Sequence, residues 1–248
     1  QDKDKGVIRD AIRPLLTVAI HPSGYYLAAG FISCVQLMHI LHNELKLYKQ
    51  LKDAKGYDLK NCTKMKFSHG GNLFVVCDQR NIYMYHSYTC ELLKFQSCQL
   101  QTISTITFNH KDTYLSIVTN DGFLYLYDIV DFKRGDGSID RNCDFKSCLF
   151  ITQPPPPSNS LLSKSHHKEE FKIVAVGSEM NKGLVRVFNQ KEDVELTVGF
   201  NLTKKFTEAC LIKSFANNIE NIIVGTDKGQ IKIISLPPDV NADIEFDS

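Results

Sequence analysis

The 248-residue sequence has no tryptophan, no long apolar segment and no excess of either charge. Its 29 Lys and Arg nearly balance its 28 Asp and Glu, whereas proteins that bind phosphate backbones are strongly basic. Its apolar runs, such as LLTVAI, are far shorter than the ~18 residues that span a bilayer. The N-terminal sequence QDKDKGVIRD lacks the apolar core of a secretory signal. We therefore expect an intracellular protein that binds neither nucleic acid nor membrane.

The cysteines form no metal-ligand or disulfide pattern. No two of them are in a CxxC arrangement, and eight cysteines are dilute in a chain of this length. Cys34 and Cys77 lie in or beside apolar segments, where a free thiol behaves as a small hydrophobic group. We predict that all eight are reduced and structural: Cys34, Cys62, Cys77, Cys90, Cys98, Cys143, Cys148 and Cys210.

The common signatures of catalysis are also missing. The chain has no GxSxG or HExxH motif and no paired-carboxylate spacing. Gly225 and Gly229 lack the further glycines and the following helix of a phosphate-binding loop, so we expect them to form a hairpin turn. We predict no catalytic, cofactor-binding or metal-binding residues, no cofactor, and a protein that is not an enzyme.

What the sequence does contain is a repeat. Thr17–Gly30 reads TVAIHPSGYYLAAG: an apolar segment, a short polar turn and a second apolar segment. Lys64–Cys77 and Thr105–Val118 have the same form, and in the third copy the turn TNDG leads to a third segment, FLYLYD. Period-two alternation with Asn-Asp-Gly turns indicates antiparallel strands joined by hairpins.

Five copies of this unit can be aligned at the ends of their third strands. The steps between them are 47, 42, 61 and 46 residues, and the aligned positions are Met38, Tyr85, Tyr127, Phe188 and Ile234. A period of roughly 40 to 50 residues with four strands per unit is typical of a WD40-type β-propeller. A small sheet cannot bury both of its faces alone, so the units, or blades, stack on one another. The predicted fold is therefore an all-β, WD40-type β-propeller with five recognisable blades.

The predicted propeller portion spans residues 1–248. The long step between the third and fourth copies coincides with QPPPPSNSLLSKSHHKEE, residues 153–170, whose prolines, serines and charges cannot pack a core. We interpret this segment as an inserted surface loop. Candidate fourth strands are KLYKQL, ELLKFQ and VELTVGF, and the predicted blades are 14–53, 61–98, 102–143, 146–201 and 207–248.

Three histidines look like a catalytic or metal-binding set. His21, His69 and His110 each lie in the turn between the first and second strands of a blade, so we interpret them as one repeated turn position. Equivalent turns are spread around a propeller ring, so the three imidazoles should not converge on an ion. His166 and His167 fall in the predicted insertion, where a solvated loop is expected.

The sequences of the repeats resemble those of a known family. Most WD40 blades end their third strand in Trp-Asp, and here only Tyr127-Asp128 approximates that pair. HPSGYYLAAGF followed by VQLMHIL, then CTKMKFSHGGNLFVV, STITFNHKDTYLSIVTNDGFLYLYDI and IIVGTDKGQIKIISLP, in that order, are similar to consecutive blades of the cilia- and flagella-associated WD-repeat proteins. The resemblance covers about Leu16 to Pro238 and is weakest in the fourth blade.

The resemblance implies a function as well as a fold. Members of that family have propellers followed by a long coiled coil, and they act as non-enzymatic scaffolds that seat inner-arm dyneins and regulatory complexes on the axoneme. This chain has no heptad region, so it would be a propeller portion of such a protein. The expected partners are axonemal or dynein-associated proteins, and the expected location is the cytoskeleton of a cilium or flagellum.

Two other functions remain open at this point. One is a scaffold subunit of a nuclear or RNA-processing assembly, for which the Lys-rich segment Lys46–Lys60 is the best candidate surface, although Asp53 and Asp58 favour a solvated connection. The other is a propeller-fold enzyme, which would need acidic residues or histidines converging at a central channel.

The number of blades leads to a last expectation. The resemblance implies a seven-bladed ring, so five blades would be part of a ring with two uncovered end faces, including Val18, Ile20, Ile231 and Ile233. Exposed apolar faces promote association. We expect the chain either to self-associate through these ends or to be completed by blades outside it.

Overall fold

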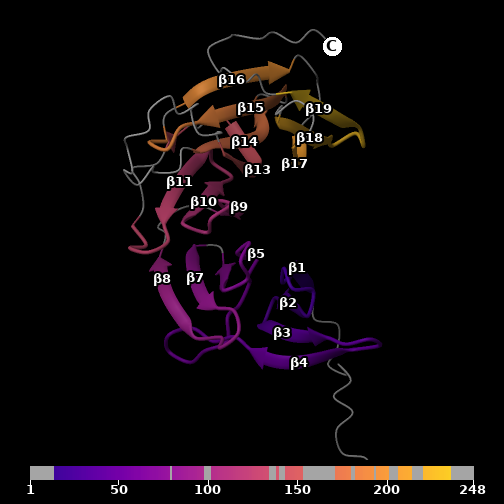
Figure 1. Cartoon of the computed structure of the whole chain (residues 1–248), viewed down its shortest axis with the longest axis vertical. Helices are drawn as coiled ribbons and strands as arrows, with labels where there is room; N and C mark the ends of the chain where they lie inside the picture. Colours follow the sequence, from indigo (N-terminus) through magenta and orange to yellow (C-terminus); the bar gives the residue numbers. More distant parts are fainter. Residues whose placement is uncertain are drawn as a thin grey trace, which may run out of the picture. The chain divides into compact units, whose positions relative to one another are not determined.

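A computed structural model describes residues 14–78, 80–97, 102–133, 138–139, 143–152, 171–179, 182–192, 194–200, 206–213 and 220–235. All regular structure in these residues is β-strand (Figure 1), and no helix in them is long and apolar enough to cross a membrane. The predicted insertion 153–170, with His166 and His167, and Cys98 lie outside the described residues. The chain divides into two compact units, Gln1–Ile103 and Ser104–Ser248.

The first unit contains two four-stranded antiparallel sheets, each with its strands in sequence order. Strands β1 and β5 begin the two sheets, and the predicted fourth strands KLYKQL and ELLKFQ correspond to β4 and β8. The first sheet consists of β1 (Leu15–Ile20), β2 (Tyr26–Phe31), β3 (Val35–Ile40) and β4 (Leu45–Gln50), and the second of β5 (Lys64–Phe67), β6 (Leu73–Cys77), β7 (Asn81–His86) and β8 (Leu92–Ser97).

The second unit contains three further antiparallel sheets. The third sheet consists of β9 (Ile103–Phe108), β10 (Tyr114–Thr119), β11 (Phe123–Asp128) and β12 (Ser138–Ile139). The fourth consists of β13 (Cys143–Thr152), β14 (Phe171–Glu179), β15 (Lys182–Phe188) and β16 (Val194–Phe200). The fifth has three strands in the described residues, β17 (Phe206–Lys213), β18 (Glu220–Thr226) and β19 (Ile231–Ser235).

One blade boundary differs from the prediction. Cys143 was expected at the end of the third blade, but it begins β13, the first strand of the fourth sheet, where it pairs with Glu179. In the described residues the fourth strand of the third sheet is the two-residue β12, which pairs with Phe123 and Leu124 of β11. The Leu126 N–H, further along β11, instead donates to the buried Glu192 carboxylate at 2.6 Å. A side chain therefore satisfies this backbone donor of β11.

The repeat alignment corresponds to a structural position. In three sheets the pairing of the third and fourth strands shifts by one residue at the aligned site, between Leu37 and Met38, Met84 and Tyr85, and Val187 and Phe188. The five aligned residues are all buried: Met38, Tyr85, Tyr127, Phe188 and Ile234. The repeated residue therefore marks a bulge and a core position in each of those three sheets.

The apolar residues of β9 and β11 form the core of the third sheet. Ile106, Phe108, Leu124 and Leu126 are all buried. Thr107, which alternates to the other face of β9, is also buried, at 9% exposure. Residues on both faces of this strand are therefore buried.

The first unit has its core between its two sheets. Ala28 and Leu37 of the first sheet join Phe67, Phe74 and Val76 of the second in one apolar cluster. Residues paired directly across an antiparallel ladder share a face of the sheet. The face of the first sheet that points away from this cluster carries the pairs Ile20–Leu27, Leu27–Met38 and Met38–Leu47. On that face Val18, Ile20 and Leu47 are 46%, 63% and 54% exposed. The first sheet thus has one covered apolar face and a second on which Val18, Ile20 and Leu47 are open, although Met38 between them is buried.

Candidate interaction surfaces

A turn with the same hydrogen bonds follows the first strand of three sheets. The first residue of each turn is His21, Ser68 or Asn109, and its N–H donates to the carbonyl of the residue five positions later, Tyr26, Leu73 or Tyr114. All three first residues are nearly fully buried, and their side chains accept hydrogen bonds from backbone N–H groups within the turn. The turn is therefore held by whichever side chain occupies this position.

The interpretation of His21, His69 and His110 as one repeated residue was wrong. His69 and His110 lie one position later in the turn than His21, and both are exposed. All three do lie in turns between first and second strands, as predicted. In the described residues, no group of three or more His, Cys, Asp or Glu side chains is arranged to hold a metal ion.

The fourth residue of the turn needs a left-handed backbone. Gly24, Gly71 and Asp112 have φ of 76°, 77° and 55°, and the N–H of each donates to the carbonyl of the first residue of its turn. Glycine adopts this conformation without a steric penalty, and aspartate tolerates it better than most residues. A Cβ added at Gly71 would lie 2.6 Å from His21 Nε2, whereas a Cβ added at Gly24 would have no atom within 4 Å.

His21 joins the first sheet to the second. Its Nε2 lies 2.8 Å from the Gly71 carbonyl oxygen, and its Nδ1 accepts from the Ser23 N–H at 3.1 Å. Because a carbonyl can only accept, Nε2 carries the proton and the imidazole is the neutral Nε2–H tautomer. The ring contacts Phe67 edge to face, with centroids 5.0 Å apart. A buried histidine therefore fixes the turns of two neighbouring sheets to each other.

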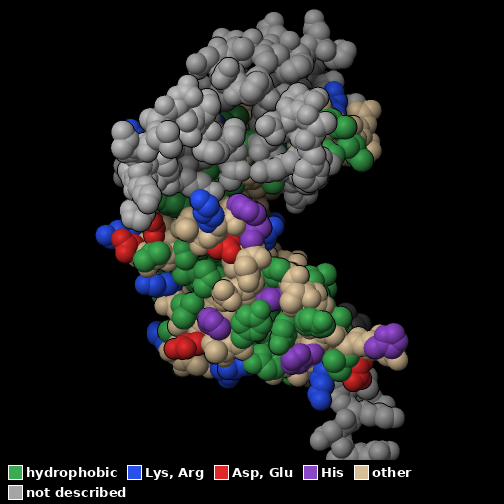
Figure 2. Space-filling view, viewed as in Figure 1, with side chains coloured by type: hydrophobic (Ala, Val, Ile, Leu, Met, Phe, Trp, Pro, Cys, Tyr) green, Lys and Arg blue, Asp and Glu red, His purple; other side chains and the backbone are tan. Residues whose placement is uncertain are grey.

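Around His21 the two sheets form a continuous set of ring contacts, which we call the ring cluster. Tyr26 contacts His39, Tyr48 and Tyr88 at centroid distances of 4.9 Å, 6.1 Å and 6.0 Å, and His21 contacts Tyr88 at 5.3 Å. Figure 2 shows histidine side chains lying among hydrophobic ones over this unit. The cluster consists of His21, Tyr26, His39, Tyr48, Phe67, Phe74, His86 and Tyr88.

Two more hydrogen bonds join the sheets at the edge of the ring cluster. The Tyr48 hydroxyl donates to the Tyr88 carbonyl at 2.8 Å, and Lys49 Nζ donates to the Thr89 carbonyl at 3.1 Å. Sequence reasoning missed the cluster because its members come from strand ends and turns spaced irregularly along the chain. The only available signal was the frequency of His and Tyr in these turns.

The Lys-rich segment Lys46–Lys60 begins in β4 and continues as the connection between the first two sheets. Leu51 and Leu59 are buried in the core and anchor it at both ends. Between them, the Asp53 carboxylate accepts from the N–H groups of Lys55 and Tyr57, both at 2.8 Å. The segment is therefore a folded connection whose acidic groups stabilise its own turn.

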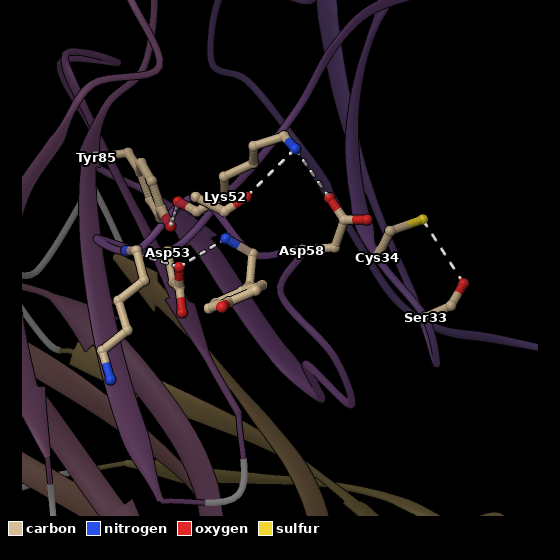
Figure 3. Close-up of polar contacts among 9 residues, drawn as sticks. Ser33, Cys34, Lys52, Asp53, Asp58 and Tyr85 are labelled. Carbon is tan, nitrogen blue, oxygen red and sulfur yellow. Dashed lines mark hydrogen bonds and ion pairs between the residues drawn. The ribbon is translucent and has the colours of Figure 1, made fainter.

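Side chains also fasten this connection to the second sheet. In Figure 3 the Tyr85 hydroxyl points to the Lys52 carbonyl, at 2.8 Å, and Lys52 Nζ lies 3.7 Å from the Asp58 carboxylate. Burial raises the pKa of Tyr85, so its phenol is neutral and donates this bond.

Six of the eight cysteines are buried thiols outside any disulfide. Burial, followed by the charge of Asp78, raises the pKa of Cys62 to about 12. Burial, followed by the charge of Glu179, likewise raises the pKa of Cys143 to about 12. Such thiols are protonated at neutral pH and are poor nucleophiles. The six cysteines are Cys34, Cys62, Cys77, Cys90, Cys143 and Cys148.

The predicted glycine hairpin is present, with one correction. Gly229 has φ of 72°, and its N–H donates to the Thr226 carbonyl at 3.1 Å. Gly122 forms the same bond to Thr119 in the third sheet. Gly225 is not part of the turn, because it lies within β18. Glycine at this position permits the left-handed conformation that closes both hairpins.

The fifth sheet also has an open apolar face. Ile231 and Ile233 of β19 are 75% and 68% exposed. The exposure predicted for Val18, Ile20, Ile231 and Ile233 is thus confirmed.

Comparison with curated proteins finds relatives of one kind. The mouse cilia- and flagella-associated protein 57 is 26% identical over 146 residues, which are 59% of this chain and 11% of that protein. Protein 57 A of Tetrahymena thermophila is 34% identical over 74 residues, 30% of this chain and 5% of that protein. The chain therefore spans about a tenth or less of the length of these relatives. No family model matches it.

Comparison with solved structures identifies the architecture. The chain superposes on U3-55K, a WD40 propeller protein, with a TM-score of 0.67 at 12% identity, covering 92% of this chain and 63% of that one. The all-β, β-propeller fold predicted from the repeats is therefore confirmed. The predicted resemblance is confirmed too: over about half of its length, this chain is similar to cilia- and flagella-associated protein 57.

Proposed function

We propose that the chain is a non-catalytic protein-interaction scaffold of a cilium or flagellum. The observation that carries this proposal is the similarity to cilia- and flagella-associated protein 57 of mouse and Tetrahymena, whose names place those proteins in cilia and flagella. The propeller-type sheets add support, since stacked blades present turns and sheet ends to partners on a rigid frame. The charge balance of the sequence fits protein partners better than nucleic acid or membrane.

The more specific role that we propose is to help seat inner-arm dynein or regulatory complexes on the axoneme, as part of a larger, seven-bladed ring. The open faces of the first and fifth sheets support a larger ring, because each is an apolar surface that a further blade would cover. The coverage of U3-55K supports it as well, since more than a third of that chain has no counterpart here.

The proposed role is tested by locating the protein and its partners. The endogenous protein, tagged and expressed in ciliated cells, is expected in the axonemal fraction after detergent extraction, and dynein-arm proteins are expected to co-purify with it after salt release. A cytosolic tagged protein of similar size serves as the control. Recovery in nuclear or ribonucleoprotein fractions would contradict the proposal and favour the alternative scaffold role. The similarity to U3-55K does not favour that alternative, because at 12% identity it concerns the fold alone.

A further inference from the structure

We propose that the open face of the first sheet binds the open face of the fifth sheet of a second copy of the chain, head to tail. This inference rests on the proposed scaffold role, for which it names the sheet that covers each open face. The repeat alignment distinguishes the two sides of every sheet. We call the side that carries the aligned residue, such as Tyr85, the aligned face, and the side that carries the residue just before it the reverse face.

The core between the first two sheets shows which faces meet. The second sheet contributes Phe74 and Tyr85 from its aligned face, and the first sheet contributes Ala28 and Leu37 from its reverse face. In each sheet these two residues are paired across the ladder, so they share a face. The contact therefore joins unlike faces: the aligned face of one sheet packs on the reverse face of the sheet before it.

The same polarity recurs in two further cores. Where the third and fourth sheets pack together, Phe188 lies on the aligned face of the fourth sheet and Leu126 on the reverse face of the third. Where the fourth and fifth sheets pack together, Ile234 of the fifth and Val187 of the fourth hold the corresponding positions. All three cores thus join an aligned face to the reverse face of the preceding sheet.

The open face of the first sheet is an aligned face. It carries the aligned residue Met38, which is buried and pairs with the exposed Leu47. The two charged residues of these four strands, Lys46 and Lys49, pair with His39 and Leu37 and lie on the reverse face. The open face is therefore uncharged along its strands. Its side chains with exposures of 46% to 63% are Val18, Ile20, Leu45 and Leu47.

The open face of the fifth sheet is a reverse face. Ile233 is the residue just before the aligned Ile234, and Ile231 lies two positions earlier on the same strand and shares its face. In the repeat alignment these two isoleucines correspond to Leu37 and Val35 of the first sheet, which are buried in the core that it forms with the second sheet. Ile231 and Ile233 are 75% and 68% exposed. They therefore occupy positions that a following sheet covers in the first blade.

An open aligned face and an open reverse face are the two halves of the contact that three cores already contain. The exposed side chains named on both faces are aliphatic, so joining the faces removes apolar surface from water. Two first sheets would instead bring two aligned faces together, a pairing that none of these cores uses. The contact is heterologous, so a copy that is bound at one face keeps the other face free, and copies add in a row or a ring.

The test compares the sedimentation velocity of the 248-residue chain and three lysine variants over a range of concentrations. Ile20→Lys places a charge on the open aligned face and Ile233→Lys on the open reverse face, whereas Val130→Lys, at 77% exposure outside the strands, is the matched control. We expect the parent chain and Val130→Lys to form species larger than dimers as the concentration rises. Ile20→Lys and Ile233→Lys alone should each need a concentration at least about tenfold higher to associate, because an unpaired charge is costly to bury.

The decisive sample is an equimolar mixture of Ile20→Lys and Ile233→Lys. The first variant keeps an intact reverse face and the second an intact aligned face, so one copy of each should join in a dimer that grows no further. Equal denaturant midpoints of the four proteins, measured at a concentration where the parent chain is monomeric, show that the variants are folded.

Three outcomes would overturn the proposal: a parent chain that stays monomeric, a mixture that sediments like the two separate variants, or an Ile233→Lys variant that associates on its own as the parent does. The last outcome would assign self-association to two aligned faces. If the chain stays monomeric while axonemal proteins still co-purify with the tagged protein, this contact is wrong and the scaffold role stands.

Discussion

The two faces of the first sheet have similar apolar residues but different surroundings. One face places Ala28 and Leu37 against the second sheet, and both residues are almost fully buried. The other carries Val18, Ile20 and Leu47, which are about half exposed or more. Monomeric soluble proteins rarely leave an apolar face of this kind open. Strand alternation in the sequence therefore gives this sheet apolar residues on both faces, and on one of them Val18, Ile20 and Leu47 are open to solvent.

The largest effect should come from a matched pair of leucines on the two faces. Leu37→Ala removes a side chain at 2% exposure from the core, and we expect a loss of about 2 to 5 kcal/mol in the free energy of unfolding. Leu47→Ala, at 54% exposure on the neighbouring strand, should change it by no more than about 0.5 kcal/mol. Urea unfolding of both variants measures the difference. Equal losses would mean that the open face is covered within the chain.

A second pair concerns the turns that join the covered face to the second sheet. Gly24 and Gly71 share a left-handed φ, so alanine at either position costs about 1 kcal/mol of strain. At Gly71 the new Cβ also meets the His21 ring, and overpacking adds about 1 to 3 kcal/mol. Thermal unfolding should therefore separate Gly71→Ala from Gly24→Ala. If the two variants have the same melting temperature, His21 can move away from the new Cβ and does not hold the two turns together.

The smallest of these effects compares two histidines. His21→Ala leaves the Gly71 carbonyl without its buried donor, and we expect a loss of about 1 to 3 kcal/mol in the free energy of unfolding. His69→Ala, at an exposed site in the next blade, should stay within about 0.5 kcal/mol of the parent chain. Chemical denaturation measures both. A comparable loss from His69→Ala would restore the view that the two residues play one role.

The sequence predicted the repeats well because strand alternation and turn residues are local properties. The aligned positions Met38, Tyr85 and Phe188 mark the same bulge, although nothing but spacing relates them in the sequence. The equivalence of His21 with Ser68 was missed because the turn needs a buried acceptor, which side chains of different chemistry can supply. Matching residue types therefore failed to identify the equivalent turn positions, because different side chains make the same turn hydrogen bond in different sheets.

The candidate surfaces depended more on tertiary structure. The exposure of Val18, Ile20, Ile231 and Ile233 was predicted from their positions in the first and last recognised repeats. The ring cluster could not be predicted, since Tyr26, Tyr48 and Tyr88 meet only after two sheets have stacked. The buried leucines of the connection, Leu51 and Leu59, were hidden for a similar reason: the lysines around them indicate a solvated segment when the sequence is considered alone.

The most direct test of an uncovered blade face is sedimentation velocity of the 248-residue chain over a range of concentrations, beside its Ile20→Lys variant. Ile20 is 63% exposed, so the charge should not affect folding, and the two proteins should unfold at the same denaturant midpoint. We predict that the parent chain forms larger species as its concentration rises and that Ile20→Lys shifts it toward monomer. A parent chain that sediments as a monomer at every concentration, indistinguishable from the variant, would contradict it.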